Sequence, residues 1–236
     1  KEADCSVAMA SGSDVAAQIS DLVLMNSDFS SMPSVVAEGR RVINNIERAA
    51  SLYLVKNIFS LILAVISITA AFSYPLTPSQ LTLMSLLAIG IPSLILALEP
   101  NENLVQGKFL RNAILRALPA AFTDLFIIIF VLLFQQAFQI NNNEISTITA
   151  LLVTIVGFFM LWKVAKPVNR LHVGMMAGLI AALVFIVLFL PGLFSLSPLS
   201  FGGYLILILF TLLIPSVIWL LNKALEGLLL LLQKAE

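Results

Sequence analysis

Cysteine, histidine and charge are scarce in this 236-residue chain. The single cysteine, Cys5, excludes a disulfide framework and a cysteine-based zinc site. The single histidine, His172, argues against a histidine-rich metal site or a histidine catalytic network. Charged residues make up only 11% of the chain and sum to zero net charge, which gives no bulk electrostatic reason to bind DNA, RNA or an anionic surface. We therefore expect no nucleic-acid partner.

Apolar residues dominate what is there: 60% of the chain is hydrophobic, and the mean hydropathy is +1.03. From Ala49 onward, six apolar stretches approach the roughly 20 residues that a membrane-spanning helix needs. The second stretch is short and is interrupted by Gly90-Ile91-Pro92. The sequence predicts a mostly α-helical, polytopic domain over 49–236 that lies in the lipid bilayer, with spans at about 49–72, 81–98, 113–138, 147–164, 171–190 and 203–221.

Basic residues occur in alternate connections between these stretches. The segment before the first span, the second-to-third and fourth-to-fifth connections and the C-terminal tail all carry Lys or Arg. The other connections, 73–80, 139–146 and 191–202, carry none. Because cytoplasmic loops are enriched in Lys and Arg, this alternation predicts an even number of spans in the plasma membrane, with both termini cytoplasmic.

The first 48 residues are mixed in character and indicate a small α/β segment. Two β-like runs, Val7–Ala10 and Leu22–Met25, flank a helix whose N-cap lies at or near Asp14. Pro33 suits the first turn of a further helix that enters the first span. The chain opens with Lys1 and has no signal-peptide pattern. We expect that the natural start is missing; a processed mature protein is the alternative.

Two ionisable side chains fall well inside the predicted spans, Lys56 in the first and Asp124 in the third. Charge inside a membrane is costly and is a functional hypothesis by default. Lys56 either snorkels to the cytoplasmic interface or supplies a fixed positive charge beside a transport site. Asp124 pairs with a neighbour such as Lys56, reaches interfacial water, or touches a transport pathway.

Polar and helix-breaking residues mark the first two spans. Asn57 and Ser60 share a helix face, and Ser85 lies in the second span, where Gly90 and Pro92 would free backbone carbonyls. Broken helices at membrane depth line cavities or bind ions, and packing of small residues is the alternative.

Four residues near span ends are expected at the membrane interface: Glu99, His172, Trp162 and Trp219. Glu99 has a second interpretation, as a ligand at the mouth of an ion path.

The run KEADCSVAMASGSDVAAQISDLVLMNSDFSSMPSVVAEGRRVINNIERA resembles the end of the P-type ATPase phosphorylation domain, where a similar segment follows the GDGxND loop. The resemblance implies that 1–30 are the C-terminal remnant of a Rossmann-like, HAD-type domain, that 31–48 form a cytoplasmic linker helix, and that the six spans are the last six of ten. The matching pieces are Lys1, Ala3-Asp4, Val7-Ala8-Met9, Gly12, Asp14, Ala16-Ala17, Asp21, Val23-Leu24, Asp28-Phe29, Glu38-Gly39-Arg40 and Asn45-Ile46.

The resemblance implies a full-length parent that pumps a cation at the expense of ATP, with ATP and Mg2+ as cofactors. This chain has no match to the DKTGT phosphorylation loop or to the nucleotide-binding motifs. By itself it is expected neither to hydrolyse ATP nor to bind these cofactors, and it carries no assigned catalytic or metal-ligating residue. The implied partners are the missing N-terminal part of the pump and the transported cation.

Residues of the first two spans are the candidates for the ion path, and the two intramembrane charges are the candidates for tuning it. The ion-path residues are Asn57, Ser60, Ser85, Gly90 and Pro92, and the charge-tuning residues are Lys56 and Asp124.

The choice of substrate depends on the second span. Animal-type calcium pumps carry NLVTDGLP where this chain has Ser85–Pro92, with Ala88 at the threonine position and Ile89 at the carboxylate position. Calcium prefers oxygen ligands, so this argues against the usual calcium geometry. The pieces SDFSSMP, GRRVINNIERA and IGIPSLILALEPN are similar to the bacterial cation-transporting ATPase E group, which favours calcium.

Two alternatives stay open. The pair Lys56-Asn57 is similar to a Lys-Asn pair in the fifth span of lipid flippases, so lipid is a second substrate class. A free-standing, non-enzymatic membrane protein is the third interpretation.

Overall fold

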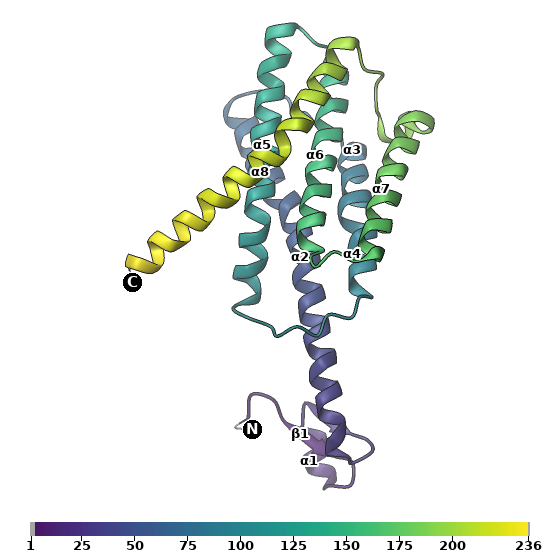
Figure 1. Cartoon of the computed structure of the whole chain (residues 1–236), viewed down its shortest axis with the longest axis vertical. Helices are drawn as coiled ribbons and strands as arrows, with labels where there is room; N and C mark the ends of the chain where they lie inside the picture. Colours follow the sequence, from purple (N-terminus) through teal and green to yellow (C-terminus); the bar gives the residue numbers. More distant parts are fainter. Residues whose placement is uncertain (1–2, 236) are drawn as a thin grey trace. The chain divides into compact units, whose positions relative to one another are not determined.

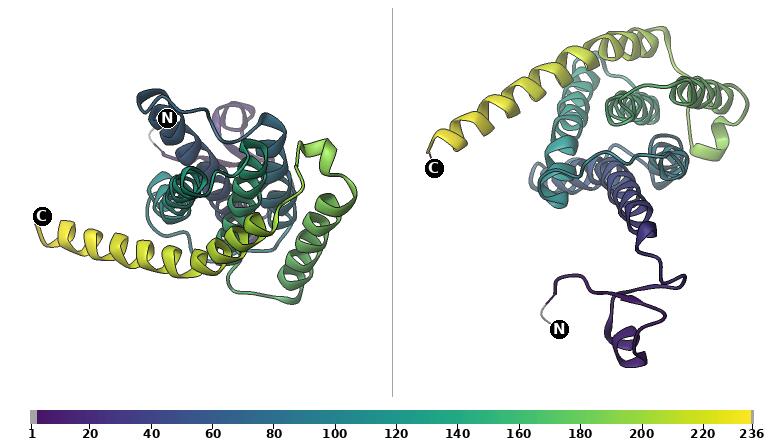
Figure 2. Two further views of the ribbon diagram at one scale, coloured as in Figure 1. Left: turned by 90° about the horizontal axis from the view of Figure 1, so that it is seen from above. Right: turned by 60° about the horizontal axis from the view of Figure 1, so that its bottom comes forward.

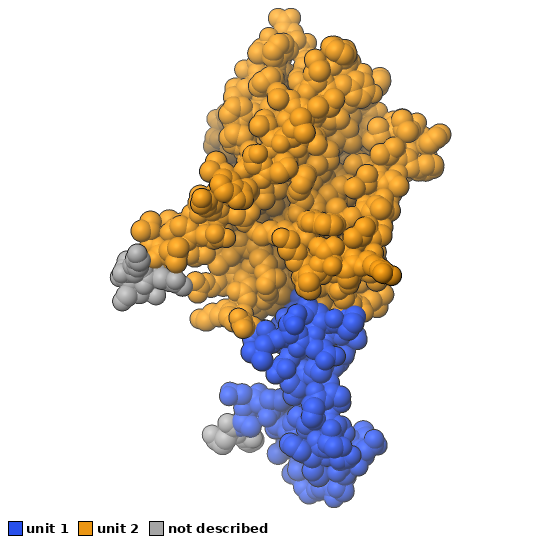
Figure 3. All heavy atoms as spheres, viewed as in Figure 1, with its two compact units in different colours: residues 1–44, 100–105 blue, residues 45–99, 106–236 orange. Residues whose placement is uncertain are grey.

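A computed structural model describes residues 3–235, and the side chains of 232–235 are not described. Lys1, which belongs to the motif quoted above, lies outside the described residues, as do Glu2 and Glu236. The chain divides into two compact units, residues 1–44 with 100–105 and residues 45–99 with 106–236 (Figure 3).

The first unit contains a small parallel pair of strands. Strands β1 (Val7–Met9) and β2 (Leu22–Leu24) pair with Val7 opposite Leu22, and helix α1 (Asp14–Ile19) connects them. The two predicted strands are confirmed, each one residue shorter than expected. The side chain of Ser13 caps α1 by accepting the Ala16 N–H. Among the described residues the sheet has two strands, so the expected Rossmann-like domain stays a prediction.

Asp21, just before β2, is hydrogen-bonded to Ser6, just before β1. Its carboxylate accepts hydrogen bonds from the Ser6 N–H and the Ser6 hydroxyl, both at 2.9 Å. These bonds favour the ionised form and lower the pKa of Asp21 below its usual value.

The second unit is a bundle of long helices (Figure 1). Six helical segments are long and apolar enough to cross a membrane, which confirms the predicted number of spans. A short 3-10 helix, η1 (Phe29–Ser31), precedes α2, and a second one, η3 (Pro191–Phe194), follows α7. Helix α2 (Met32–Thr69) begins in the first unit and enters the bundle at Asn45. The other helices of the bundle are α3 (Pro78–Met84), the π-helix η2 (Ser85–Gly90), α4 (Ile91–Ala97), α5 (Phe109–Phe138), α6 (Asn142–Val164), α7 (Arg170–Phe189) and α8 (Phe201–Ala235).

Helix α6 forms the centre of the bundle. In its most apolar window 78% of the residues are buried, against 17% for α8. Figure 2 shows α6 surrounded by the other helices. Two fully buried threonines, Thr149 and Thr154, lie on this helix, and the Thr154 hydroxyl donates to the Ala150 carbonyl. The central helix therefore carries polar groups inside the bundle.

Helix α8 is longer than the sequence predicts. It runs without interruption to Ala235, although the apolar stretch was expected to end near 221. Its C-terminal part continues past the bundle (Figure 1). The segment after Asn222 is rich in Leu, Lys and Glu, which are strong helix formers, so the helix outlasts the membrane-spanning pattern.

Candidate functional site

Lys56 joins the first and second spans. Its Nζ donates to the Ser85 Oγ at 2.7 Å, and that hydroxyl donates in turn to the Leu81 carbonyl at 2.7 Å. The structure thus brings together two candidate residues that lie 29 positions apart in the sequence. The ammonium is held against the second span, at the residue where that span leaves α-helical geometry.

The second span is helical throughout, but its middle is a π-helix. Residues 85–90 form this turn, and the Ile91 N–H bonds to the Leu86 carbonyl, five residues back. A π-helix turn inside an α-helix occurs frequently at functional sites. Pro92, which is buried in the first turn of α4, has no N–H to donate. The predicted break at Gly90-Ile91-Pro92 is therefore a change of helix type that leaves carbonyls with altered partners.

The π-helix packs tightly against the central helix. A Cβ built on Gly157 of α6 would lie 2.5 Å from the Cβ of Ala88. Real carbon atoms do not approach so closely, so the two helices need glycine at this point. The π-helix is thus held between Lys56 of α2 on one side and Gly157 of α6 on another.

Two further ion-path candidates lie away from this contact. The Ser60 hydroxyl shares a hydrogen bond of 3.2 Å with the Tyr74 hydroxyl, and Asn57 is exposed on the described chain. The structure does not join either residue to Ser85. Their role in an ion path stays a prediction.

Asp124 departs from the expected contacts. It is fully buried in α5, and neither carboxylate oxygen has a hydrogen-bond partner among the described residues. The expected pairing with Lys56 is wrong, because neither Asp124 oxygen has a partner in the described chain and Lys56 donates to Ser85 instead. Contact with interfacial water is also wrong, because both oxygens are enclosed. No group of three or more His, Cys, Asp or Glu residues that could hold a metal ion occurs in the described part of the chain.

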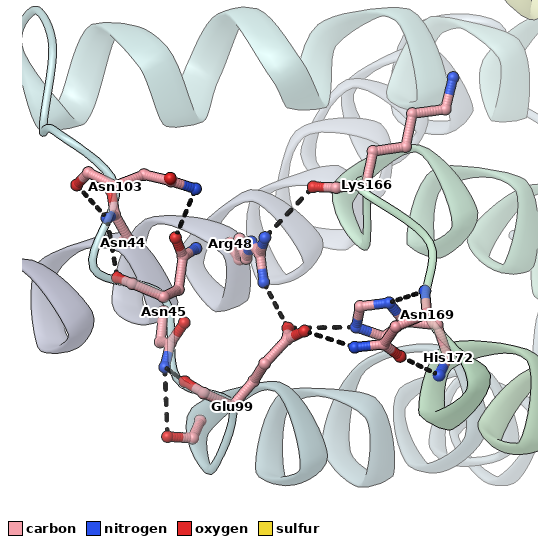
Figure 4. A network of polar contacts seen from close by, with 10 residues as sticks. Asn44, Asn45, Arg48, Glu99, Asn103, Lys166, Asn169 and His172 are labelled. Atoms are coloured by element: carbon pink, nitrogen blue, oxygen red, sulfur yellow. Dashed lines mark hydrogen bonds and ion pairs between the residues drawn. The ribbon is translucent and has the colours of Figure 1, made fainter.

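A network around Glu99 is the largest polar feature that sequence reasoning missed (Figure 4). Glu99, just after α4, accepts from Arg48 Nη1 of α2 at 2.6 Å and contacts His172 Nε2 of α7 at 3.1 Å, both through Oε2. Its Oε1 accepts from Asn169 Nδ2 at 2.9 Å. His172 is fully buried among protein atoms at the start of α7, so Glu99 forms an internal bridge, and the expected position of His172 at the membrane interface stays a prediction.

The local fold fixes the orientation of His172. Asn169 and His172 form a capping box at the start of α7, in which the Asn169 N–H donates to His172 Nδ1 at 3.2 Å. Because Nδ1 accepts, the proton of the neutral ring lies on Nε2 and points at Glu99. The three-residue spacing of Asn169 and His172 at the start of a helix could have predicted the capping box from the sequence. Nothing in the sequence predicted the contact between His172 and Glu99.

A second polar cluster ties α2 to α5. The Glu47 side chain, which is 6% exposed, pairs with Arg116 at 3.0 Å and accepts from Asn112 Nδ2 at 3.2 Å. Ser51 donates back to the Glu47 carbonyl. Helix α2 is therefore bound through Arg48 to Glu99 and α7, and through Glu47 to α5.

Comparisons with known proteins identify relatives. No protein-family model matches the chain. The chain is 39% identical over 175 residues to the probable cation-transporting ATPase exp7 of Streptococcus pneumoniae, which covers 71% of this chain and 22% of that protein. It is 31% identical over 215 residues to the calcium-transporting ATPase CtpE of Mycolicibacterium smegmatis, covering 84% of this chain and 27% of the relative.

A more distant match is the P-type sodium-transporting ATPase4 of Toxoplasma gondii, 36% identical over 104 residues, or 44% of this chain and 8% of that protein. The chain thus spans about a quarter of the length of the first two relatives, which are 22% and 27% covered. With six candidate spans and this similarity to cation-transporting ATPases over most of its length, the chain belongs to the P-type cation-transporting ATPase family.

Proposed function

We propose that this chain is the C-terminal membrane part of a pump that couples ATP hydrolysis to the transport of a cation across the plasma membrane. The observation that carries the proposal is the similarity to cation-transporting ATPases over 71% and 84% of the chain. ATP and Mg2+ act in the part of the pump that precedes this chain. Calcium is the proposed cation, because the CtpE relative is named for it.

The remnant before the spans links the two parts of such a pump. We take residues 1–30 as the tail of the phosphorylation domain and 31–48 as the linker. Helix α2 has no break between Met32 and Thr69, so a rotation at its cytoplasmic end is carried along the helix to Lys56.

The Lys56–Ser85 contact supports a place for the ion path. A cation cannot use the Ser85 hydroxyl while an ammonium lies 2.7 Å from it, because like charges at that distance repel strongly. Movement of Lys56 would then uncover Ser85 and the carbonyls of the π-helix around Gly90 and Pro92. Oxygen ligands of this kind suit calcium, although the second span offers no carboxylate.

The test compares ion-stimulated ATPase activity and ion uptake in inside-out vesicles that carry the complete pump. Ca2+ should stimulate both activities, and Lys56→Met should change the cation concentration for half-maximal activity while Lys56→Arg stays near the parent. Stimulation by phospholipid without any response to cations would instead support the flippase interpretation.

The coding DNA upstream of Lys1 provides an independent check. We expect an open reading frame that continues into GDGxND and DKTGT motifs. A ribosome-binding site and start codon directly before Lys1 would refute the pump and favour the free-standing membrane protein.

A further inference from the structure

A pocket of about 510 Å³ opens where α5 begins, α6 ends and the C-terminal half of α8 passes by. All three helices belong to the second unit. Its polar lining consists of three charged side chains and three amides: Arg116, Lys163, Glu226, Gln106, Asn112 and Asn222. This end of the bundle carries the basic connections that the positive-inside rule places on the cytoplasmic side. The pocket therefore opens at the end of the bundle that is predicted to be cytoplasmic.

The charges in the pocket are of both signs. Arg116 uses one nitrogen to pair with Glu47 at 3.0 Å, while its side chain stays 45% exposed. Lys163 Nζ donates to Asn222 Oδ1 and has further donors to offer. Glu226 forms no ion pair among the described side chains. A single opening is thus lined by two cationic groups, Arg116 and Lys163, and by the carboxylate of Glu226, which forms no ion pair among the described side chains.

Two independent features favour a position for this opening at the depth of lipid headgroups. Lys223 of α8 lies over the Trp219 ring, 4.9 Å from its centroid, and Trp162, next to Lys163, is exposed. Tryptophan is enriched where a membrane meets water. Leu225 and Leu229 line the same pocket, so it offers an apolar wall beside the charged groups.

We propose that this pocket binds the headgroup of an aminophospholipid such as phosphatidylethanolamine. Lys163 and Arg116 bind the phosphate, as cationic side chains do in phosphate sites. Glu226 accepts from the primary ammonium, and the acyl chains lie along Leu225 and Leu229. Basic pockets between helices near the cytoplasmic face bind anionic headgroups, and the carboxylate of Glu226 is what selects a lipid that also carries a positive group.

The experiment measures lipid retention and thermal unfolding of the purified protein in mixed micelles. Three lipids with the same acyl chains are compared: phosphatidylethanolamine, phosphatidylglycerol and phosphatidylcholine. We expect phosphatidylethanolamine to be retained best and to raise the unfolding temperature most. Phosphatidylcholine should bind less well, because its quaternary ammonium has no N–H to donate to Glu226. Preference for phosphatidylglycerol, or equal retention of all three, would overturn the proposal.

Variants separate the two halves of the headgroup. Lys163→Gln should weaken retention of phosphatidylethanolamine by about tenfold, the loss expected for one hydrogen bond to a charged group. Glu226→Gln should remove the preference over phosphatidylglycerol. The matched control is Arg111→Gln, an exposed basic residue near the start of α5 that does not line the pocket. Equal effects of Lys163→Gln and Arg111→Gln would refute the phosphate site, and an unchanged preference in Glu226→Gln would refute the ammonium site. The lipid comparison on the parent protein stands even where a variant fails to fold.

Discussion

Asp124 is a carboxyl group whose burial is not balanced by any partner in the described chain. A buried polar group left without a hydrogen bond costs about 1–3 kcal/mol, and replacement by an apolar group of the same shape can be stabilising. Leucine repeats the branching of aspartate, with methyl groups where the oxygens are. We therefore predict that Asp124→Leu increases the free energy of unfolding by about 1–3 kcal/mol, measured by thermal unfolding in detergent.

Asp124→Ala is the control for this prediction, because it removes the same oxygens but leaves a cavity. Its stability should be lower than that of Asp124→Leu. A lower unfolding temperature for Asp124→Leu than for the parent would show that the carboxyl has a stabilising partner that the described residues do not contain.

Glu99 is the opposite case, a nearly buried carboxylate with three partners from two helices. Removing one member of a buried ion pair leaves the other charge without compensation and costs about 3–5 kcal/mol. We predict a loss of this size for Glu99→Ala, since Arg48 is 7% exposed and has no other acidic partner among the described side chains. Thermal unfolding of the membrane-inserted chain measures it.

Glu99→Gln keeps the shape and one acceptor oxygen, so its loss should be smaller than that of Glu99→Ala. Glu102→Gln, an exposed neighbour, should change nothing. If Glu99→Ala and Glu102→Gln unfold at the same temperature, the network does not hold α2, α4 and α7 together.

At the scale of single residues, sequence reasoning located unusual side chains better than it located their partners. It selected Lys56, Ser85 and Asp124 because charge and polarity are rare inside a membrane. It could not pair Lys56 with Ser85, Arg48 with Glu99, or Glu99 with His172, because these partners are 29, 51 and 73 positions apart. Such contacts depend on which helices pack together, and apolar composition alone does not determine that.

Among the contacts between elements, the one between the π-helix and α6 leaves no room for an added carbon atom at Gly157. Gly157→Ala would place a methyl group 2.5 Å from the Ala88 Cβ. Overpacking of a well-packed core costs about 1–3 kcal/mol, and we predict a loss of this size for Gly157→Ala. Gly174→Ala and Gly178→Ala are matched controls on α7, because a Cβ at either position has no atom within 4 Å.

A compensating change tests the cause of that loss. Ala88→Gly removes the methyl group that Gly157→Ala would strike, so the double variant should recover stability relative to Gly157→Ala alone. If the double variant is no more stable than the sum of the two single losses, the close approach is not the reason. In the complete pump, the same pair of variants would show whether ion transport follows the packing of the π-helix.

Element boundaries depended on capping as much as on hydrophobicity. The apolar pattern predicted a fourth span from about 147, whereas α6 begins at Asn142, because Asn141 caps it by accepting the Asn143 N–H. The pattern also marked Gly90-Ile91-Pro92 as an interruption, and the chain accommodates these residues with a π-helix that ends at Gly90. Helix caps extend a helix beyond its apolar core, and a change of helix type leaves no clear trace in composition.

For the whole molecule, the number of spans was predictable and their packing was not. Apolar stretches of this length with few charges indicate membrane-spanning helices, and the structure has six helices long and apolar enough to cross a membrane. Helix α6 is the most buried of the six, and its buried threonines and the close approach of Gly157 to Ala88 are the features that suit it to the centre of the bundle. The sequence alone does not show that these residues mark a central helix, because it does not show which helices pack against α6.

The orientation of the whole chain in the membrane is also a prediction from the sequence. Six spans would place both ends of the chain on one side, and the basic connections predict that this side is cytoplasmic. Cys5 is the only cysteine of the chain and is exposed, so it is a natural probe. In a protein whose only cysteine is Cys5, a membrane-impermeant maleimide should label inside-out vesicles and leave intact spheroplasts unlabelled.

The reciprocal variant reports the opposite side of the membrane. Cys5→Ser combined with Ser73→Cys moves the thiol to an exposed position in the connection between α2 and α3, which carries no Lys or Arg. This variant should be labelled in spheroplasts and protected in sealed inside-out vesicles. Labelling of Cys5 from outside the cell would reverse the orientation and place Lys163, Arg116 and the basic connections on the outer face. Labelling of both positions from the same side would mean that α2 does not cross the membrane, and the six-span arrangement would then fail.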